Sequence, residues 1–179
     1  MAATLTRTLR GAVAGAAAAG VWVAQQPLDK RVFGIDYDDA HMLGRLVASG
    51  PSAYPIGFAL HVGNGALLGA LYANAAPSLP GPPPLRGPLA ALAEHLASWP
   101  AAVALDRLHP GPPGPVLLGS GRAFAQATWR HLLFGVILGE LERRLNPARE
   151  APTRPDAEAV ASNGHGSAEH LVTTGPAPS

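Results

Sequence analysis

The chain has 179 residues, enough for one domain, and only 14% of them are charged, against roughly 25% in an ordinary soluble domain. Its net charge of +1 gives no reason to expect nucleic-acid binding. It has no cysteine, which excludes a disulfide framework, a thiolate metal site and a cysteine nucleophile. The charge deficit is local, because residues 11–28 and 46–85 contain no charged residue. A transmembrane helix needs about 20 mainly apolar residues, so both runs are long enough to cross a bilayer.

Four segments of membrane length follow one another along the chain: 10–28, 54–76, 86–105 and 121–144. The first two lack the charged outer stripe that a helix of a soluble bundle would show. We therefore predict an all-α fold, with a four-helix transmembrane bundle in residues 1–146. An Ala/Gly-rich soluble bundle is the alternative. The polar tail, residues 147–179, has low hydrophobicity and several prolines and is predicted to be disordered.

The connections between these segments differ in character. Between the first two, Asp38 or Asp39 is suited to cap a short helix whose one face carries apolar side chains. This pattern predicts an amphipathic helix at the membrane interface, with an apolar face made of Met42, Leu43, Leu46 and Val47. The Pro/Gly-rich segments 77–88 and 108–121 are predicted to be loops.

A repeated pattern links the two halves of the chain. "HVGNGALLGAL" begins at His61 and "HLLFGVILGEL" begins at His131, and both read H-x-x-x-G-x-x-L-G-x-L. The pair Arg10-Gly11 recurs at residues 86–87, and a Trp followed six residues later by Leu-Asp-base occurs in both halves. The pattern predicts a duplicated two-helix hairpin. A hairpin crosses the membrane twice, so the two copies would be parallel repeats.

The first apolar segment follows Arg7 and Arg10, an arrangement that a cleaved signal peptide also shows. Because its counterpart in the second half lies inside the chain, we expect the first segment to be a retained helix.

Small residues recur every four positions and predict helix-packing faces, because residues four apart lie on one side of a helix. In lipid, such faces let helix backbones approach closely. His61 lies on one of these stripes, so we expect it to face another helix and to form an interhelical hydrogen bond. Asn64, one turn away, is a possible partner. The predicted packing glycines are Gly11, Gly15, Gly57, Gly65, Gly69, Gly135 and Gly139.

Two charged residues lie deep inside predicted spans, and both are in the second half of the chain: Glu94 and Arg130. A charge without a partner at the bilayer centre costs about 2.5 to 3.5 kcal/mol on insertion scales. The economical interpretation is that the two residues pair with each other, and Ser98 and Gln126 lie one turn away to satisfy remaining groups. His95 and Glu140 are competing partners for Arg130, and Glu140 is also placed to pair with Arg144. Trp22 and Trp99 are predicted to anchor the helices at the interface.

The strings "QQPLDKR", "AEHLASWP" and "FAQATWRHLLFGVILGELERRLN" resemble small, uncharacterised four-helix integral membrane proteins of actinobacterial type. The resemblance covers residues 10–146. That group has no established activity, so the resemblance implies a fold and no catalytic residues.

The function expected from these features is a structural or interaction role in the cell membrane, with both termini in the cytoplasm. The expected partners are the lipid bilayer and further copies of the same chain. No catalytic residue, cofactor or nucleic-acid partner is predicted. One alternative is haem or metal binding by the equivalent histidines His61 and His131. Another is a small proton or solute transporter component that uses Glu94 and Arg130. The residues predicted to form an intramembrane polar cluster are His61, Asn64, Glu94, His95, Ser98, Gln126, Arg130 and His131.

Overall fold

The computed structural model describes residues 2–108 and 117–147, with side chains for residues 4–107 and 117–147. These residues form five α-helices, two short 3-10 helices and no strand, so the prediction of an all-α fold is confirmed. The predicted disorder of the tail concerns residues 148–179, outside the described ranges. The elements are α1 (Ala2–Phe33), α2 (Asp39–Val47), η1 (Gly50–Ser52), α3 (Ala53–Ala75), η2 (Ala76–Ser78), α4 (Pro83–Leu108) and α5 (Gly121–Leu145).

Local sequence sets the ends of several helices. Gly34 follows α1 with a φ of 65°, a left-handed conformation that favours glycine just past a helix C-terminus. The side chain of Asp38 accepts a hydrogen bond from the backbone N–H of His41 and caps α2, as expected from the sequence. Ser120 caps α5 in the same way. The expectation that residues 77–88 form only a loop was wrong, because α4 already begins at Pro83, and proline fits the first turn of a helix.

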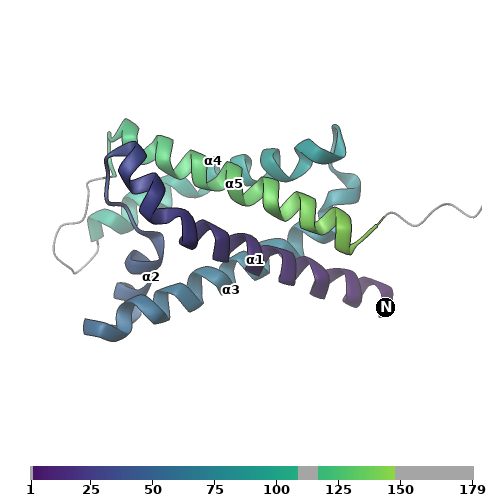
Figure 1. Cartoon of the computed structure of the whole chain (residues 1–179), viewed down its shortest axis with the longest axis horizontal. Coiled ribbons are helices and arrows are strands. Elements are labelled where there is room, and N and C mark those ends of the chain that lie inside the picture. Colours follow the sequence, from purple (N-terminus) through teal and green to yellow (C-terminus); the bar gives the residue numbers. More distant parts are fainter. Residues whose placement is uncertain (1, 109–116, 148–179) are drawn as a thin grey trace, which may run out of the picture. The chain divides into compact units, whose positions relative to one another are not determined.

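The long helices form two pairs, α1 with α3 and α4 with α5, and α1 also packs along α5. Figure 1 shows α1 between α3 and α5, with α2 beside the first part of α3. In contrast, α3 and α4 make hardly any contact with each other. This arrangement leaves α1 as the central helix and a gap between α3 and α4.

Glycine is required where the helices of each pair cross. A Cβ added at Gly15 would come closer than 3.0 Å to the carbonyl oxygen of Gly65, a separation that real Cβ atoms essentially never show. Gly11 and Gly69 face each other in the same way one turn along the two helices. Gly57 lies against the backbone of α2, while in the second pair Gly135 and Gly139 lie against Gly87. The helices therefore pack backbone to backbone at these points.

The short helix α2 packs on α3 through its small residues, because Ala40 and Gly44 are buried and lie against Ala53 and Gly57. Its predicted apolar face is divided between two environments. Met42 and Leu43 line a cavity inside the bundle, whereas Val47 is 65% exposed.

By length and composition, one helical segment of the described chain is long and apolar enough to cross a membrane, Gly50–Ser78, and a third of its apolar window is buried. One such segment is weak evidence by itself. The other long helices carry Gln, Glu, His or Arg among their apolar residues. The helical bundle is thus observed, whereas the four-span arrangement belongs to the proposal below.

Candidate functional site

Arg130 of α5 lies at the centre of a buried polar cluster, and none of its side chain is exposed. Its Nε and Nη2 donate to the two carboxylate oxygens of Asp29 at 2.6 and 2.7 Å, a bidentate ion pair. Nη1 donates to Oδ2 of Asp39 at 2.8 Å, and Nη2 also donates to the carbonyl oxygen of Tyr37 at 3.0 Å. Each nitrogen of this guanidinium therefore has an acceptor.

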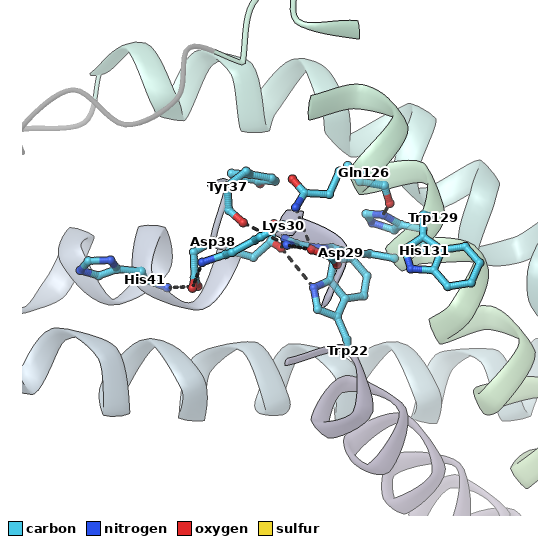
Figure 2. Close-up of polar contacts among 12 residues, drawn as sticks. Trp22, Asp29, Lys30, Tyr37, Asp38, His41, Gln126, Trp129 and His131 are labelled. Atoms are coloured by element: carbon cyan, nitrogen blue, oxygen red, sulfur yellow. Dashed lines mark hydrogen bonds and ion pairs between the residues drawn. The ribbon is translucent and has the colours of Figure 1, made fainter. Parts of the chain in front are cut away.

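Neighbouring side chains complete the hydrogen bonding of the two carboxylates (Figure 2). Gln126 donates to Oδ1 of Asp29 at 2.7 Å, and Gln25 donates to the other oxygen of the same carboxylate. The indole N–H of Trp22 donates to Oδ2 of Asp39 at 3.1 Å. We call Trp22, Gln25, Asp29, Tyr37, Asp39, Gln126 and Arg130 the Arg130 cluster.

Electrostatics at the edge of this cluster follow from its ion pairs. Burial raises the pKa of Asp39, but the positive charge of Arg130 and the Tyr37 hydroxyl outweigh burial, so the pKa lies below its usual range. Beyond it, Lys30 bridges the carboxylates of Asp36 and Asp38 at 2.8 and 2.9 Å. The bond from Lys30 lowers the pKa of Asp36.

The predicted pair of Glu94 and Arg130 was wrong. Arg130 binds Asp29 and Asp39, whereas Glu94 pairs with His131. The reason is the length of α1, which was expected to leave the membrane at residue 28 but continues to Phe33. Asp29 consequently points into the bundle and is only 1% exposed.

Next to the Arg130 cluster lies a cavity of about 370 Å³, which we call the histidine cavity. All five helices contribute to its wall. Most of that wall is aromatic or aliphatic, and Asp39 is shared with the Arg130 cluster. The other polar side chains in its wall are His61, Asn64, Glu94, His95, Ser98 and His131, so six of the eight residues predicted to form an intramembrane polar cluster line this cavity.

Glu94 and His131 share one proton. Nδ1 of His131 lies 2.7 Å from the carbonyl oxygen of Ala127, which can only accept, so this nitrogen carries a hydrogen. Nε2 lies 3.0 Å from Oε2 of Glu94. A hydrogen bond there requires one proton, held either by the imidazole or by the carboxyl group. The pair therefore has no net charge in either form.

The tautomer of His95 is assigned by its partner. The hydroxyl of Thr128 donates its only hydrogen to the carbonyl oxygen of Phe124 at 2.8 Å, so it accepts from Nε2 of His95 at 3.0 Å. Nδ1 of His95 is then an acceptor, and it is buried without a hydrogen-bond partner among the described residues. The ring of His95 also lies against that of His131, with centroids 4.5 Å apart.

His61 is buried on the packing face of α3, but Nε2 of its ring has no hydrogen-bond partner in the described part of the chain. The expected bond to Asn64 is not formed, because Asn64 is exposed at the wall of the cavity. Ser98 donates instead to the carbonyl oxygen of His95, one turn before it.

Trp22 separates the two histidines of the repeat, with its ring centroid 5.1 Å from that of His61 and 4.6 Å from that of His131. The expectation that it anchors the helix at an interface was wrong, because it is 5% exposed and bonded to Asp39 inside the bundle. A haem ligated by both histidines would have to displace this indole. Among the described residues, no group of three His, Cys, Asp or Glu side chains is arranged to hold a metal ion.

Sequence reasoning missed the partners of Arg130 and the role of Trp22. A signal for Asp29 was present, since the Leu-Asp-Lys string follows an uncharged run and provides a carboxylate close to the predicted span. Asp39 was interpreted only as a helix cap, although Asp38 fills that role. Glu140 was assigned correctly: it pairs with Arg144, and also with Arg143.

No family model, curated protein or solved structure matches the chain in the comparisons with known proteins. The function therefore has to be inferred from the residues and their geometry.

Proposed function

We propose that the chain is a multi-pass integral membrane protein in which α1, α3, α4 and α5 cross the bilayer. The observation that carries this proposal is the distribution of polarity among the large side chains, which differs from that in a soluble domain. Among the described residues, four of the five largest fully buried side chains are polar, Arg130, His95, Gln126 and Asp29. In a soluble protein such positions are mainly aliphatic or aromatic.

The outer surface supplies the other half of the argument. Every long helix exposes large apolar side chains at several levels, for example Val13 at 64%, Leu67 at 58%, Leu96 at 55% and Val136 at 54%. Water would disfavour so much exposed apolar surface, whereas hydrocarbon would not. Further exposed apolar residues are Leu5, Leu9, Val21, Leu28 and Val32 on α1, Ile56, Phe58, Leu60 and Leu71 on α3, Leu85 and Leu89 on α4, and Phe124 and Trp129 on α5.

The glycine contacts support the proposed duplication. Under the repeat, Gly11 corresponds to Gly87 and Gly69 to Gly139. In the first pair of helices Gly11 lies against the backbone of Gly69, and in the second pair Gly87 lies against that of Gly139. Equivalent glycines thus lie at the crossing of each pair, although Gly87 comes closest to the carbonyl oxygen of Gly135. We further propose that both termini lie in the cytoplasm and that the chain has a structural or interaction role. The proposal is in keeping with the resemblance to small four-helix membrane proteins of actinobacterial type.

Membrane extraction tests this function. The full chain should sediment with membranes, stay there in alkaline carbonate and enter solution only with detergent. A peripheral protein in the same preparation should be released by carbonate and serves as the control. Recovery of folded, monodisperse protein in buffer without detergent would contradict the proposal. A reporter that is active only outside the cytoplasm, fused after Asn146, should be inactive, and activity there would reverse the proposed orientation.

A second candidate function is proton or solute transport, and the shared proton of Glu94 and His131 at the wall of the histidine cavity favours it. Arg130 is occupied by Asp29 and Asp39, so Glu94 and His131 carry this candidate. Proteoliposomes holding a pH-sensitive dye provide the test. A proton flux that Glu94→Gln abolishes and Glu140→Gln leaves unchanged would support transport, and the absence of any flux above that of empty liposomes would exclude proton transport.

A further inference from the structure

The histidine cavity continues into a second, more apolar cavity. This second space, of about 220 Å³, shares Leu68, Glu94 and Phe134 with the first. It lies in the gap between α3 and α4, helices that make hardly any contact with each other. Its wall otherwise consists of small and aliphatic side chains and Tyr72. The histidine cavity holds most of the polar side chains and the second cavity hardly any, so we call them the polar and the apolar chamber; they meet at Glu94.

Two buried imidazole nitrogens in the polar chamber lack partners among the described residues. Nδ1 of His95 is an acceptor on a side chain with no exposure, and Nε2 of His61 belongs to a residue that is 8% exposed. Buried polar atoms in folded proteins are nearly always hydrogen-bonded, so each such atom calls for an explanation. Both residues line the cavity.

The charges around the cavity select the kind of ligand. Asp29 and Asp39 bring two negative charges to the single positive charge of Arg130. Of these three charged residues, Asp39 lines the cavity, next to Trp22 and Tyr37 of the Arg130 cluster. Glu94 and His131 together are neutral, as derived above. Among the described lining residues there is no unpaired Lys or Arg that would attract an anion. The polar chamber thus favours a cation.

The aromatic residues favour the same ligand. Trp22, Tyr37, Trp99 and Phe134 line the histidine cavity, and the faces of such rings attract cations, most strongly those of tryptophan. The adjoining apolar chamber is suited to a hydrocarbon body. We propose that the two cavities bind an amphipathic organic amine, with its ammonium group near Asp39, Glu94 and His95 and its apolar body in the gap between α3 and α4. The proposal depends on the cavities and not on whether the helices span a bilayer.

Three ligands of nearly the same size but different charge test this proposal: 4-phenylbutylamine, 4-phenylbutan-1-ol and 4-phenylbutyrate. The full chain is purified in dodecyl maltoside and titrated while tryptophan fluorescence is recorded, since Trp22 and Trp99 line the cavity. We expect saturable binding of the amine at least about tenfold tighter than that of the alcohol, and weaker binding still of the carboxylate. Equal affinity for amine and alcohol, preference for the carboxylate, or the absence of saturation would each overturn the proposal.

Matched variants locate the site. Glu94→Gln removes the carboxylate proposed to face the ammonium group but keeps a hydrogen bond, because the amide N–H can donate to Nε2 of a neutral His131. It should weaken amine binding about tenfold while leaving the alcohol unchanged. Glu140→Gln, on the outside of α5, should leave both affinities unchanged. If Glu94→Gln fails to fold by circular dichroism, His95→Phe takes its place, because it removes the acceptor and keeps an aromatic ring. Unchanged amine affinity in the folded variant would place the ligand elsewhere and refute the assignment.

Discussion

The Arg130 cluster and the histidine cavity adjoin each other and share Trp22, Tyr37 and Asp39, yet the guanidinium of the cluster and the imidazoles of the cavity differ in their hydrogen bonding. In the cluster, every nitrogen of Arg130 donates to an acceptor at 3.0 Å or less. In the cavity, His61 and His95 each retain a buried nitrogen without a partner among the described residues. The cluster also contains an unpaired buried atom, the amide oxygen of Gln126. A buried guanidinium whose donors are all paired nevertheless fixes one arrangement of helices, whereas imidazoles with an unpaired nitrogen do not. Substitutions in the two regions should therefore have different consequences.

The largest effect is expected for Arg130→Met. It leaves the carboxylate of Asp29 buried without its counter-charge and should lower the free energy of unfolding by about 3 to 5 kcal/mol. Arg143→Met, which removes an exposed partner of Glu140, is the control and should cost less than about 1 kcal/mol. Chemical unfolding in detergent micelles, followed by circular dichroism, measures both. Equal costs for the two variants would show that the cluster does not hold the helices together.

A double-mutant cycle with Asp29 isolates the interaction between Asp29 and Arg130. Asp29→Asn should itself be destabilising, and the double variant Asp29→Asn/Arg130→Met should cost less than the sum of the two single changes, because the second change no longer breaks an ion pair. Additive costs would mean that these two side chains do not interact.

The close approach of α1 and α3, which lies outside the cluster, makes their glycines the next test. Gly15→Ala should cost about 1 to 3 kcal/mol, because the added Cβ overlaps the backbone of Gly65. Gly20, on the same helix, has no atom within 4 Å of an added Cβ, so Gly20→Ala should be neutral or stabilise by about 0.5 to 1 kcal/mol. The same unfolding assay distinguishes them. Similar values for both variants would contradict the backbone-to-backbone packing.

Acid should weaken the cluster in a predictable direction. The pKa of Asp39 in the folded protein lies below the usual 3.8, so its contribution to stability is present above that pH and is lost as the pH falls through the folded pKa. The free energy of unfolding, measured from about pH 6 to about pH 3, should therefore fall toward the acid end and fall less steeply in Asp39→Asn. Parallel pH profiles for the two proteins would refute the role given to Asp39.

The smallest effect is expected at the cavity wall. His61→Leu loses an edge contact with Trp22 but also removes an unpaired buried nitrogen, so stability should change by less than about 1 kcal/mol. The comparison with Arg130→Met is the informative result. A cost at His61 as large as that at Arg130 would show that the histidine is part of the structural network after all.

The helical elements could largely be predicted from the sequence, because they depend on local signals. The uncharged runs, the cap at Asp38 and the stripe through Gly57, His61, Gly65 and Gly69 all act over a few residues. The start of α4 was missed, since the prolines before Arg86 were taken as helix breakers although they stand in its first turn.

The pairing of side chains could not be predicted in the same way, because it depends on distances between helices. Glu94 and Arg130 were matched because both are charged residues inside predicted spans, a criterion that ignores which face of a helix each occupies. Asp29 was outside the predicted span by a single residue, and this small error removed the actual partner of Arg130 from consideration. Six of the predicted polar residues line one cavity, because the sequence placed them on helix faces that pack toward other helices. The insertion of Trp22 between His61 and His131 had no signal in the sequence.

The most direct test of the central claim, that the apolar exterior of these helices faces lipid, is cysteine labelling. The chain has no cysteine of its own, so each introduced thiol is the only one. Val13→Cys, Leu67→Cys, Leu96→Cys and Val136→Cys place a thiol on the outer surface of each long helix, and Ser49→Cys, before η1, is the control outside the helices. In intact membranes, a charged, water-soluble maleimide should label the control and none of the four helix positions, and denaturation in detergent should make all of them reactive. Labelling of the helix positions in intact membranes at the rate of the control would contradict the account.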